Sequence, residues 1–215
     1  MAQQMNRYVS KSEQIGGGVP VWLEIPKDVV GGAYLKNNLK LNEVLASGSP
    51  VEYNHKTHEA KVLKCFKVTD VTASGTDSII TLLRTARTPE LYAGMNVMVA
   101  PATVTGTGNA VTITSVDESE AGSYKITVVT ADIDAVAVGN YIVEAEGSGT
   151  GKKMYAIPNN LTKDDTVGGD QNTLGIPRGE KYLYENTIPA MPDVVKDHIV
   201  DVAHVEFAWF AEEEV

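Results

Sequence analysis

The chain has 215 residues, 43% of them hydrophobic, and its 18 Lys and Arg against 28 Asp and Glu give a formal net charge of −10. This length and apolar content allow one large domain or two small ones with a proper core, and they argue against an intrinsically disordered chain. The acidic balance opposes binding to a phosphate backbone, because that affinity comes mostly from Lys and Arg. We therefore expect no nucleic-acid partner.

Cysteine content and hydropathy bear on where the protein folds. Cys65 is the single cysteine, so there is no disulfide framework and we expect folding in a reducing compartment, with the thiol as inert packing. Residues 1–12 are polar and lack the apolar stretch of a secretory signal, and no window approaches the roughly 18 apolar residues of a membrane helix. These patterns predict a soluble protein made in the cytosol, with no membrane partner.

Residues 1–32 are predicted to form an extended N-terminal arm. Glycine and proline recur through this segment and exclude a helix, while large apolar residues alternate along Val21–Ile25 as in a strand. Two alternatives remain open. The arm is either an edge strand packed on its own domain or a segment that docks on a neighbouring subunit by strand addition.

Residues 33–70 are predicted to be a β-hairpin with a polar tip. A turn at Ala46–Pro50 precedes a strand at Val51–Tyr53, a polar corner at Asn54–His58 and a half-buried strand at Ala60–Val71. This segment would supply one half of a small β body.

Residues 71–151 differ in composition, being rich in Thr, Val, Gly and Ala. Turn signals separate five runs of β-branched residues, at Ile79–Leu83, Asn96–Ala100, Ala110–Val116, Ser123–Val129 and Tyr141–Ala145. We predict an inserted all-β module, either a barrel or a sandwich. Residues 93–100 and 138–145 are weakly alike, which leaves internal duplication and coincidence both open.

Residues 152–215 are predicted to complete the body. A helix is expected after Pro192, with Asp193 in its first turn. Its predicted core face consists of Val195, Ile199, Val202 and Ala203. A strand is expected at Val205–Phe210. The predicted fold is therefore mainly β, with residues 33–70 and 152–215 forming a body that has one short C-terminal helix, and with residues 71–151 inserted as a module.

No motif in the chain demands catalysis. His55 and His58 have a His-x-x-His spacing, but they lie in a predicted turn without the Glu of an HExxH helix, so solvated loop histidines are favoured over a metal site. No Gly-x-Ser-x-Gly is present, and Gly147–Lys153 lacks the Ser or Thr that follows Gly-Lys in a phosphate loop. We predict that the chain is not an enzyme and has no catalytic residues, metal or cofactor.

Three segments carry a family resemblance. The arm Gly18–Leu23, the turn Ser47–Tyr53 and the segment Pro177–Pro189, followed by the short helix and closing strand, resemble tailed-bacteriophage head decoration or head-fibre proteins. The resemblance covers about half of the chain. Residues 71–151 have no counterpart in the small decoration proteins.

The resemblance implies a β-tulip-like body bound to the capsid exterior of a virion assembled in a host cytoplasm. Its partner would be the major capsid protein, whose subunit contacts it would stabilise, with further copies of itself (as a trimer) or other head proteins as additional partners. Because apolar and aromatic residues dominate interface hot spots, the candidate capsid-interface residues are Val19, Val21, Trp22, Leu23 and Ile25. The alternative for Trp22 is ordinary packing inside its own body.

A second hypothesis is a carbohydrate-binding or host-adhesion module formed by residues 71–151 and displayed on a virion or cell surface. Stacking on sugar rings needs aromatic side chains at a loop surface. This part of the chain offers only Tyr92, Tyr124 and Tyr141, with no Trp or Phe. Exposure of these tyrosines would therefore separate the two hypotheses.

Overall fold

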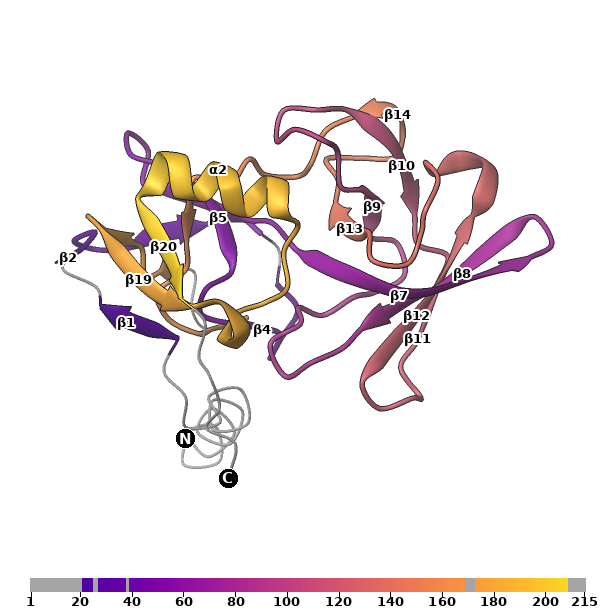
Figure 1. Ribbon diagram of the computed structural model, residues 1–215, viewed down its shortest axis with the longest axis horizontal. Coiled ribbons are helices and arrows are strands. Elements are labelled where there is room, and N and C mark those ends of the chain that lie inside the picture. Colours follow the sequence, from indigo (N-terminus) through magenta and orange to yellow (C-terminus); the bar gives the residue numbers. More distant parts are fainter. Residues whose placement is uncertain (1–20, 25–26, 38, 169–172, 209–215) are drawn as a thin grey trace.

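The computed structural model describes residues 21–24, 27–37, 39–168 and 173–208. This part of the chain is mainly β with one α-helix near its C-terminal end, as predicted. Figure 1 shows two lobes side by side, a body that carries the helix and a module of long, curved strands.

The first sheet of the body contains five strands in the order β15-β5-β6-β3-β17. Their bounds are β3 Ala33–Leu35, β5 Pro50–Asn54, β6 Glu59–Val62, β15 Asn160–Leu161 and β17 Thr173–Leu174. The predicted hairpin is confirmed, because β5 and β6 pair antiparallel around the tip at residues 55–58. The buried face of this sheet holds a small core around Val51, Tyr53 and Leu174.

The second sheet of the body has the order β1-β19-β20 and lies beside the helix α2. Its strands are β1 Trp22–Glu24, β19 Lys181–Tyr184 and β20 Val205–Ala208, and α2 spans Asp193–Ala203. β1 runs antiparallel to β19, whereas β20 runs parallel to it, because α2 carries the chain back between them. The predicted helix and closing strand are confirmed, while Trp209 and Phe210 lie outside the described residues.

The core face of α2 differs from the prediction at one position. Val195, Ile199 and Ala203 are buried, but Val202 is 47% exposed. The three buried residues are spaced four apart along the helix. Because this spacing is slightly more than one turn, the buried face shifts around the helix and leaves Val202 outside it. The helix ends where His204 adopts a left-handed backbone (φ 51°) and the chain enters β20.

Two short strand pairs close the body. β2 (Lys27–Asp28) pairs with β18 (Pro177–Arg178), and β4 (Val44–Leu45) pairs with β16 (Thr166–Val167). The turn predicted at Ala46–Pro50 joins β4 to β5. Its Gly48 has φ +80°, and a Cβ there would lie 2.4 Å from Ile188 Cγ2, so this position requires glycine on both counts.

The module is one eight-stranded sheet in the order β11-β12-β8-β7-β13-β9-β10-β14. Its strands are β7 Cys65–Ser74, β8 Asp77–Leu83, β9 Asn96–Val99, β10 Gly108–Thr112, β11 Ser115–Asp117, β12 Ser123–Val129, β13 Tyr141–Glu144 and β14 Gly149–Lys152. The sheet folds over a core formed by both of its halves, including Phe66, Ile80, Val97 and Ile126. All five predicted runs are extended.

The predicted strand at Ala110–Val116 is in fact two strands. β10 pairs with β9 and β11 pairs with β12, so the chain crosses from one half of the sheet to the other between them. The backbone N–H of Ile113 donates to Met95 O on one side, and that of Thr114 donates to Thr127 O on the other. A continuous β-branched run cannot reveal such a change of partner.

The predicted strand at Ala60–Val71 is likewise divided, into β6 and β7, at Leu63 and Lys64. β7 begins at Cys65 and pairs with β13 through its first residues and with β8 through the rest. The expected boundary between residues 70 and 71 therefore falls inside a strand of the module sheet. At the other end, β14 ends at Lys152, one residue past the expected boundary.

The two lobes share a hydrophobic core. One buried cluster combines Met98 and Val143 of the module with Leu183, Val195 and Ile199 of the body. The module is thus inserted in sequence but continuous with the body in packing, which stabilises one relative orientation of the lobes.

The two segments that are alike in sequence also lie together. β9 and β13 are antiparallel neighbours, with Val99 opposite Ile142 and Met98 opposite Val143. Each strand follows a glycine with positive φ, Gly94 at 91° and Gly139 at 89°. The likeness therefore reflects equivalent roles as a glycine turn leading into a buried central strand.

Candidate functional site

The predicted interface segment lies along the rim of the β1-β19-β20 sheet. The carbonyl of Val21 accepts a hydrogen bond from the N–H of Tyr184 at 3.0 Å, and Trp22 lies opposite Leu183. Residues 21–24 thus pack on their own body as an edge strand, which is one of the two arrangements expected for the arm. Val19 and Ile25 lie outside the described residues.

Trp22 is held by its own chain. Its ring packs half-buried against the shared core, and the indole N–H donates to Lys163 O at 2.9 Å and to Ser47 Oγ at 3.1 Å. Both acceptors come from the body. Ser47 lies in the turn after β4, where its backbone N–H donates to Asp165.

The neighbours of Trp22 differ in exposure. Val21 is half-buried and packs on the shared core. The side chains of Val21 and Ile188 both lie next to Gly48. Leu23 is 46% exposed. Of the three described candidates, Leu23 is therefore the residue whose side chain is most open to a partner.

A buried charged cluster lies where the lobes meet. Lys64 and Glu43 form an ion pair, with side chains that are 2% and 0% exposed. Glu43 comes from the turn before β4, and its second oxygen accepts from the backbone N–H of Lys40 at 2.9 Å. Lys64 comes from the break between β6 and β7 and also donates to Glu90 O at 3.4 Å.

Glu144, at the end of β13, faces the same cluster. Its backbone N–H donates to Lys64 O at 3.0 Å, and its side-chain Oε2 is buried without a hydrogen bond from any described residue. Burial raises the pKa of Glu144 to about 7; the charge of Lys64 opposes this increase, while that of Glu43 adds to it. One lysine therefore faces two carboxylates.

Tyrosine rings cover the cluster. The Tyr92 ring lies under the ammonium groups of Lys40 at 4.2 Å and Lys64 at 5.3 Å. Burial raises the pKa of the Tyr92 and Tyr155 hydroxyls, and the charge of Glu144 adds to both increases. Such cation–π contacts stabilise the lysine charges, of which that of Lys64 is buried and that of Lys40 is exposed.

This cluster was not predicted from the sequence. The predicted half-buried strand at Ala60–Val71 gave Lys64 no separate role, whereas Lys64 stands at the strand break with its side chain in the core. A recognisable pattern was present, since Lys64 sits inside the apolar run Val62–Phe66. Burial of the adjacent Cys65 agrees with its predicted role in packing, and burial raises its thiol pKa.

The two tip histidines are both exposed. His58 Nδ1 lies 3.1 Å from Tyr53 Oη, and the His55 ring meets the Tyr53 ring edge-on at 4.7 Å. Within the described ranges, no group of three or more His, Cys, Asp or Glu side chains is arranged to hold a metal ion. No helix of the described chain has the length and apolar character to cross a bilayer.

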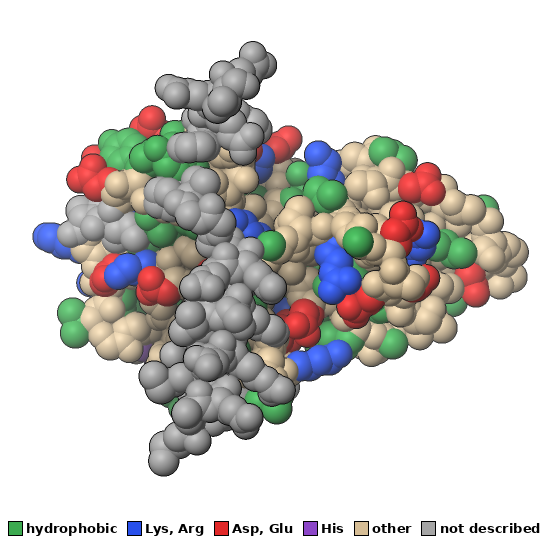
Figure 2. Space-filling model, turned by 90° about the horizontal axis from the view of Figure 1, so that it is seen from below, with side chains coloured by type: hydrophobic (Ala, Val, Ile, Leu, Met, Phe, Trp, Pro, Cys, Tyr) green, Lys and Arg blue, Asp and Glu red, His purple; other side chains and the backbone are tan. Residues whose placement is uncertain are grey.

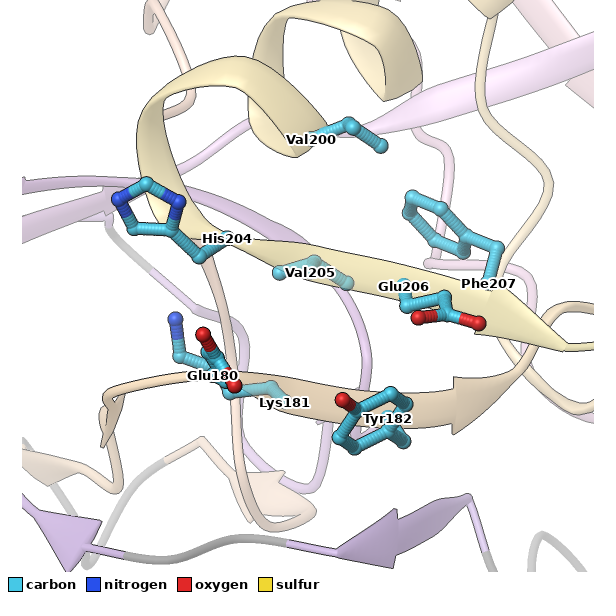
Figure 3. A pocket seen from close by; sticks show the side chains of 8 residues that line it. All are labelled: Glu180, Lys181, Tyr182, Val200, His204, Val205, Glu206 and Phe207. Carbon is cyan, nitrogen blue, oxygen red and sulfur yellow. The ribbon is translucent and has the colours of Figure 1, made fainter.

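Among the described residues, two surface depressions with the size of small-molecule sites bear on the hypotheses. One of about 510 Å³ lies between α2 and the β19–β20 strands (Figure 3). Val200 and Phe207 flank it on the helix side, while Tyr182 and Glu206 lie in front. Lys181, at its floor, is buried and donates from Nζ to Ala203 O at 2.5 Å, which caps the end of α2.

The depression on the module, of about 550 Å³, is lined by Ala, Val, Thr, Asn, Asp, Ser and Gly residues, without an aromatic ring. Tyr124 is buried under Arg84, whose guanidinium lies 4.5 Å from the ring centre. Tyr92 is covered by Lys40, and Tyr141 is half-buried. The module tyrosines are therefore poorly placed to stack on a sugar.

Lys64, Glu43 and Glu144 do not line either of the two depressions described above. A lysine and two carboxylates could exchange a proton, but catalysis also requires a substrate within hydrogen-bond reach. Because its members come from both lobes, the cluster forms a polar junction between them. Comparison with protein-family models, curated proteins and solved structures finds no match.

Proposed function

We propose that this chain is a non-enzymatic virion protein that binds the outer surface of a phage capsid and stabilises contacts between major capsid protein subunits. The resemblance of three segments to head decoration and head-fibre proteins supports this proposal. The mainly β architecture is compatible with it. A net charge of −10 also favours the exterior, because packaged DNA would repel the chain.

The observation that carries the proposal is the rim formed by β1. This strand is at one edge of the β1-β19-β20 sheet, and in the described residues no further strand pairs with it. Trp22 holds the strand to the body, while Leu23 faces outward. An edge strand with an exposed leucine offers both main-chain hydrogen-bonding groups and an apolar anchor to a partner.

The test is co-sedimentation of the purified chain with phage heads that lack it. We expect saturable binding by the wild type and at least about tenfold weaker binding by Leu23→Asp, because a buried unpaired charge costs more than 1.4 kcal/mol. The matched control is Val138→Asp, a change at a 64% exposed residue of the module. Equal loss in both variants, or no saturable binding by the wild type, would reject the proposal.

The adhesion hypothesis gains no support from the module surface, because Tyr124 is buried, Tyr92 is covered by Lys40 and Tyr141 is half-buried. This hypothesis should be tested if the chain shows no saturable co-sedimentation with phage heads. A glycan array probed with the full chain would then show selective binding that Tyr141→Ala abolishes.

A further inference from the structure

Strand β20 forms the second open edge of the β1-β19-β20 sheet. It pairs with β19 on one side, and within the described residues no strand pairs with its other side. The backbone N–H of Lys181 in β19 donates to His204 O. Because alternate residues of a strand bond to the same neighbour, the backbone N–H and C=O groups of Val205 and Phe207 are directed to the open side. These groups are available to an added strand.

The depression of about 510 Å³ follows this open edge. It is lined by residues 205–207 of β20, by residues 180–182 at the start of β19, and by Val200 and His204 at the end of α2. Figure 3 shows Val200 and Phe207 together on the helix side of the depression. A strand added to β20 would therefore have the exposed end of α2 beside one of its faces.

The two faces of this edge differ in chemistry. Val205 is buried and Phe207 packs on the shared core, so their side chains lie on the same face of the sheet as α2. Val200, which is 42% exposed, adds an apolar side chain on that face. Glu206 lies on the opposite face, next to Tyr182 in the parallel register. An added strand would meet apolar groups on one face and a carboxylate on the other.

The carboxylates at this edge lack cations. Glu180 and Glu206 are exposed, and neither has a Lys, Arg or His within ion-pair distance among the residues that the structure describes. The buried ammonium of Lys181 is directed to Ala203 O instead. Elsewhere charges of both signs are intermixed, as on the face seen in Figure 2. The β20 edge therefore favours a partner with basic side chains.

A second copy of this chain is a poor occupant. Antiparallel pairing of two β20 edges would bring Glu206 of both copies to the same face, where like charges repel. Each copy also carries a net charge of −10. The charge complementarity instead favours a segment of a different, basic protein.

We propose that the β20 edge binds an extended segment of a partner protein in which apolar residues alternate with Lys or Arg. The segment adds a strand beside β20, with its apolar side chains against Val200 and Phe207 and its basic side chains facing Glu206. This inference does not depend on capsid binding at β1. Its consequence is a sheet with a docking edge on each side, which can hold two extended segments at once.

The experiment is a titration of the full chain into a fluorescently labelled octapeptide of alternating lysine and valine, read as fluorescence anisotropy. We expect saturable binding with a Kd at least about tenfold below that of an octapeptide of alternating glutamate and valine. Glu206→Lys should reverse this preference, so that the glutamate peptide becomes the tighter ligand. The matched control Asp70→Lys, at an exposed residue of β7, should leave the preference unchanged.

A second pair of variants tests the helix side of the depression. Val200→Lys should weaken binding of the lysine peptide by about tenfold or more, because it places a cation beside the apolar face of the added strand. The matched control is Val202→Lys, a change at a residue of α2 that is 47% exposed and lies outside the depression. This control should keep the Kd within about threefold of the wild-type value.

Methylation of alternate peptide amides tests strand addition without changing the protein. One alternate set of N-methyl groups should abolish binding and the other should leave the Kd within about threefold, because only one set of N–H groups faces β20. Equal weakening by both sets, or equal binding of the lysine and glutamate peptides, would overturn the proposal. Self-association of the chain that the lysine peptide disrupts would assign the edge to a second copy and overturn it as well.

Discussion

Lys64 and Glu43 form an ion pair that is almost completely removed from solvent at the junction of the body and the module. The two residues come from different parts of the body, and the neighbouring Glu144 comes from the module. Because a charge buried without its partner is costly, this pair makes the junction sensitive to single substitutions.

Lys64→Met should lower the free energy of unfolding by about 3–5 kcal/mol, because it leaves Glu43 without its cation. The double variant Lys64→Met with Glu43→Gln should recover much of this loss. Urea denaturation of the wild type, the single variant and the double variant gives the free energy of unfolding of each. The control is Lys36→Met, which removes a surface pair with Glu59 and should cost less than about 1 kcal/mol.

A cost below about 1 kcal/mol for Lys64→Met would contradict this account. It would mean that water or a neighbouring cation replaces the lysine at the junction.

Glu144 should give the protein a pH-dependent stability. Its pKa is raised by burial from 4.5 to about 7, so the folded state binds the proton more tightly than the unfolded state. The resulting stability is complete below pH 4.5 and is lost as the pH rises through 7. Relative to Glu144→Gln, the wild type should lose about 2–3 kcal/mol between pH 5 and pH 8.

Thermal or urea unfolding of both chains at several pH values measures this difference. The matched control is Glu146→Gln, two residues along, where the side chain is exposed. Parallel pH profiles for the wild type and Glu144→Gln would show that the carboxyl group is solvated.

Gly48→Ala should destabilise the body by about 2–4 kcal/mol. The alanine would have to keep the left-handed backbone conformation of Gly48, and its Cβ would lie within 3 Å of Ile188. Gly75→Ala separates the two costs, since Gly75 has φ +67° but no atom within 4 Å of the added carbon. We expect only about 1 kcal/mol at Gly75, and equal losses at both positions would exclude the contact with Ile188.

Trp22→Phe should cost about 1–2 kcal/mol, because the ring is largely retained while the donations to Lys163 O and Ser47 Oγ are lost. Chemical denaturation gives this value. Capsid binding provides a second measurement. If Trp22 only holds β1 on the body, binding by the folded variant should remain within about threefold of the wild type, and a much larger loss would place the indole in the interface.

Much of the architecture could be predicted because its determinants are local. Ser123–Val129 alternates along a strand with one buried face, and its bounds agree with β12. The spacing of Val195, Ile199 and Ala203 predicted α2 in the same way. The polar tip of the β5–β6 hairpin also follows from its own residues.

The predictions that failed concern features that depend on pairing between segments far apart in the chain. Ala110–Val116 is uniformly β-prone, yet its two ends pair with different strands. Lys64 has the composition of a surface residue, and only the approach of Glu43 makes its burial tolerable. Trp22 fits either an interface or a core in sequence, and only the tertiary structure shows that its indole N–H donates to residues 25 and 141 positions away.

The sequence by itself determined the mainly β class, the single late helix, the hairpin and most of the strands, because periodicity and turn chemistry act over a few residues. Only the tertiary structure decided that the inserted module shares a core with the body, and that a lysine and two carboxylates meet at their junction. These features depend on contacts between residues far apart in the chain, and no local pattern records which distant partner a buried or charged side chain will meet.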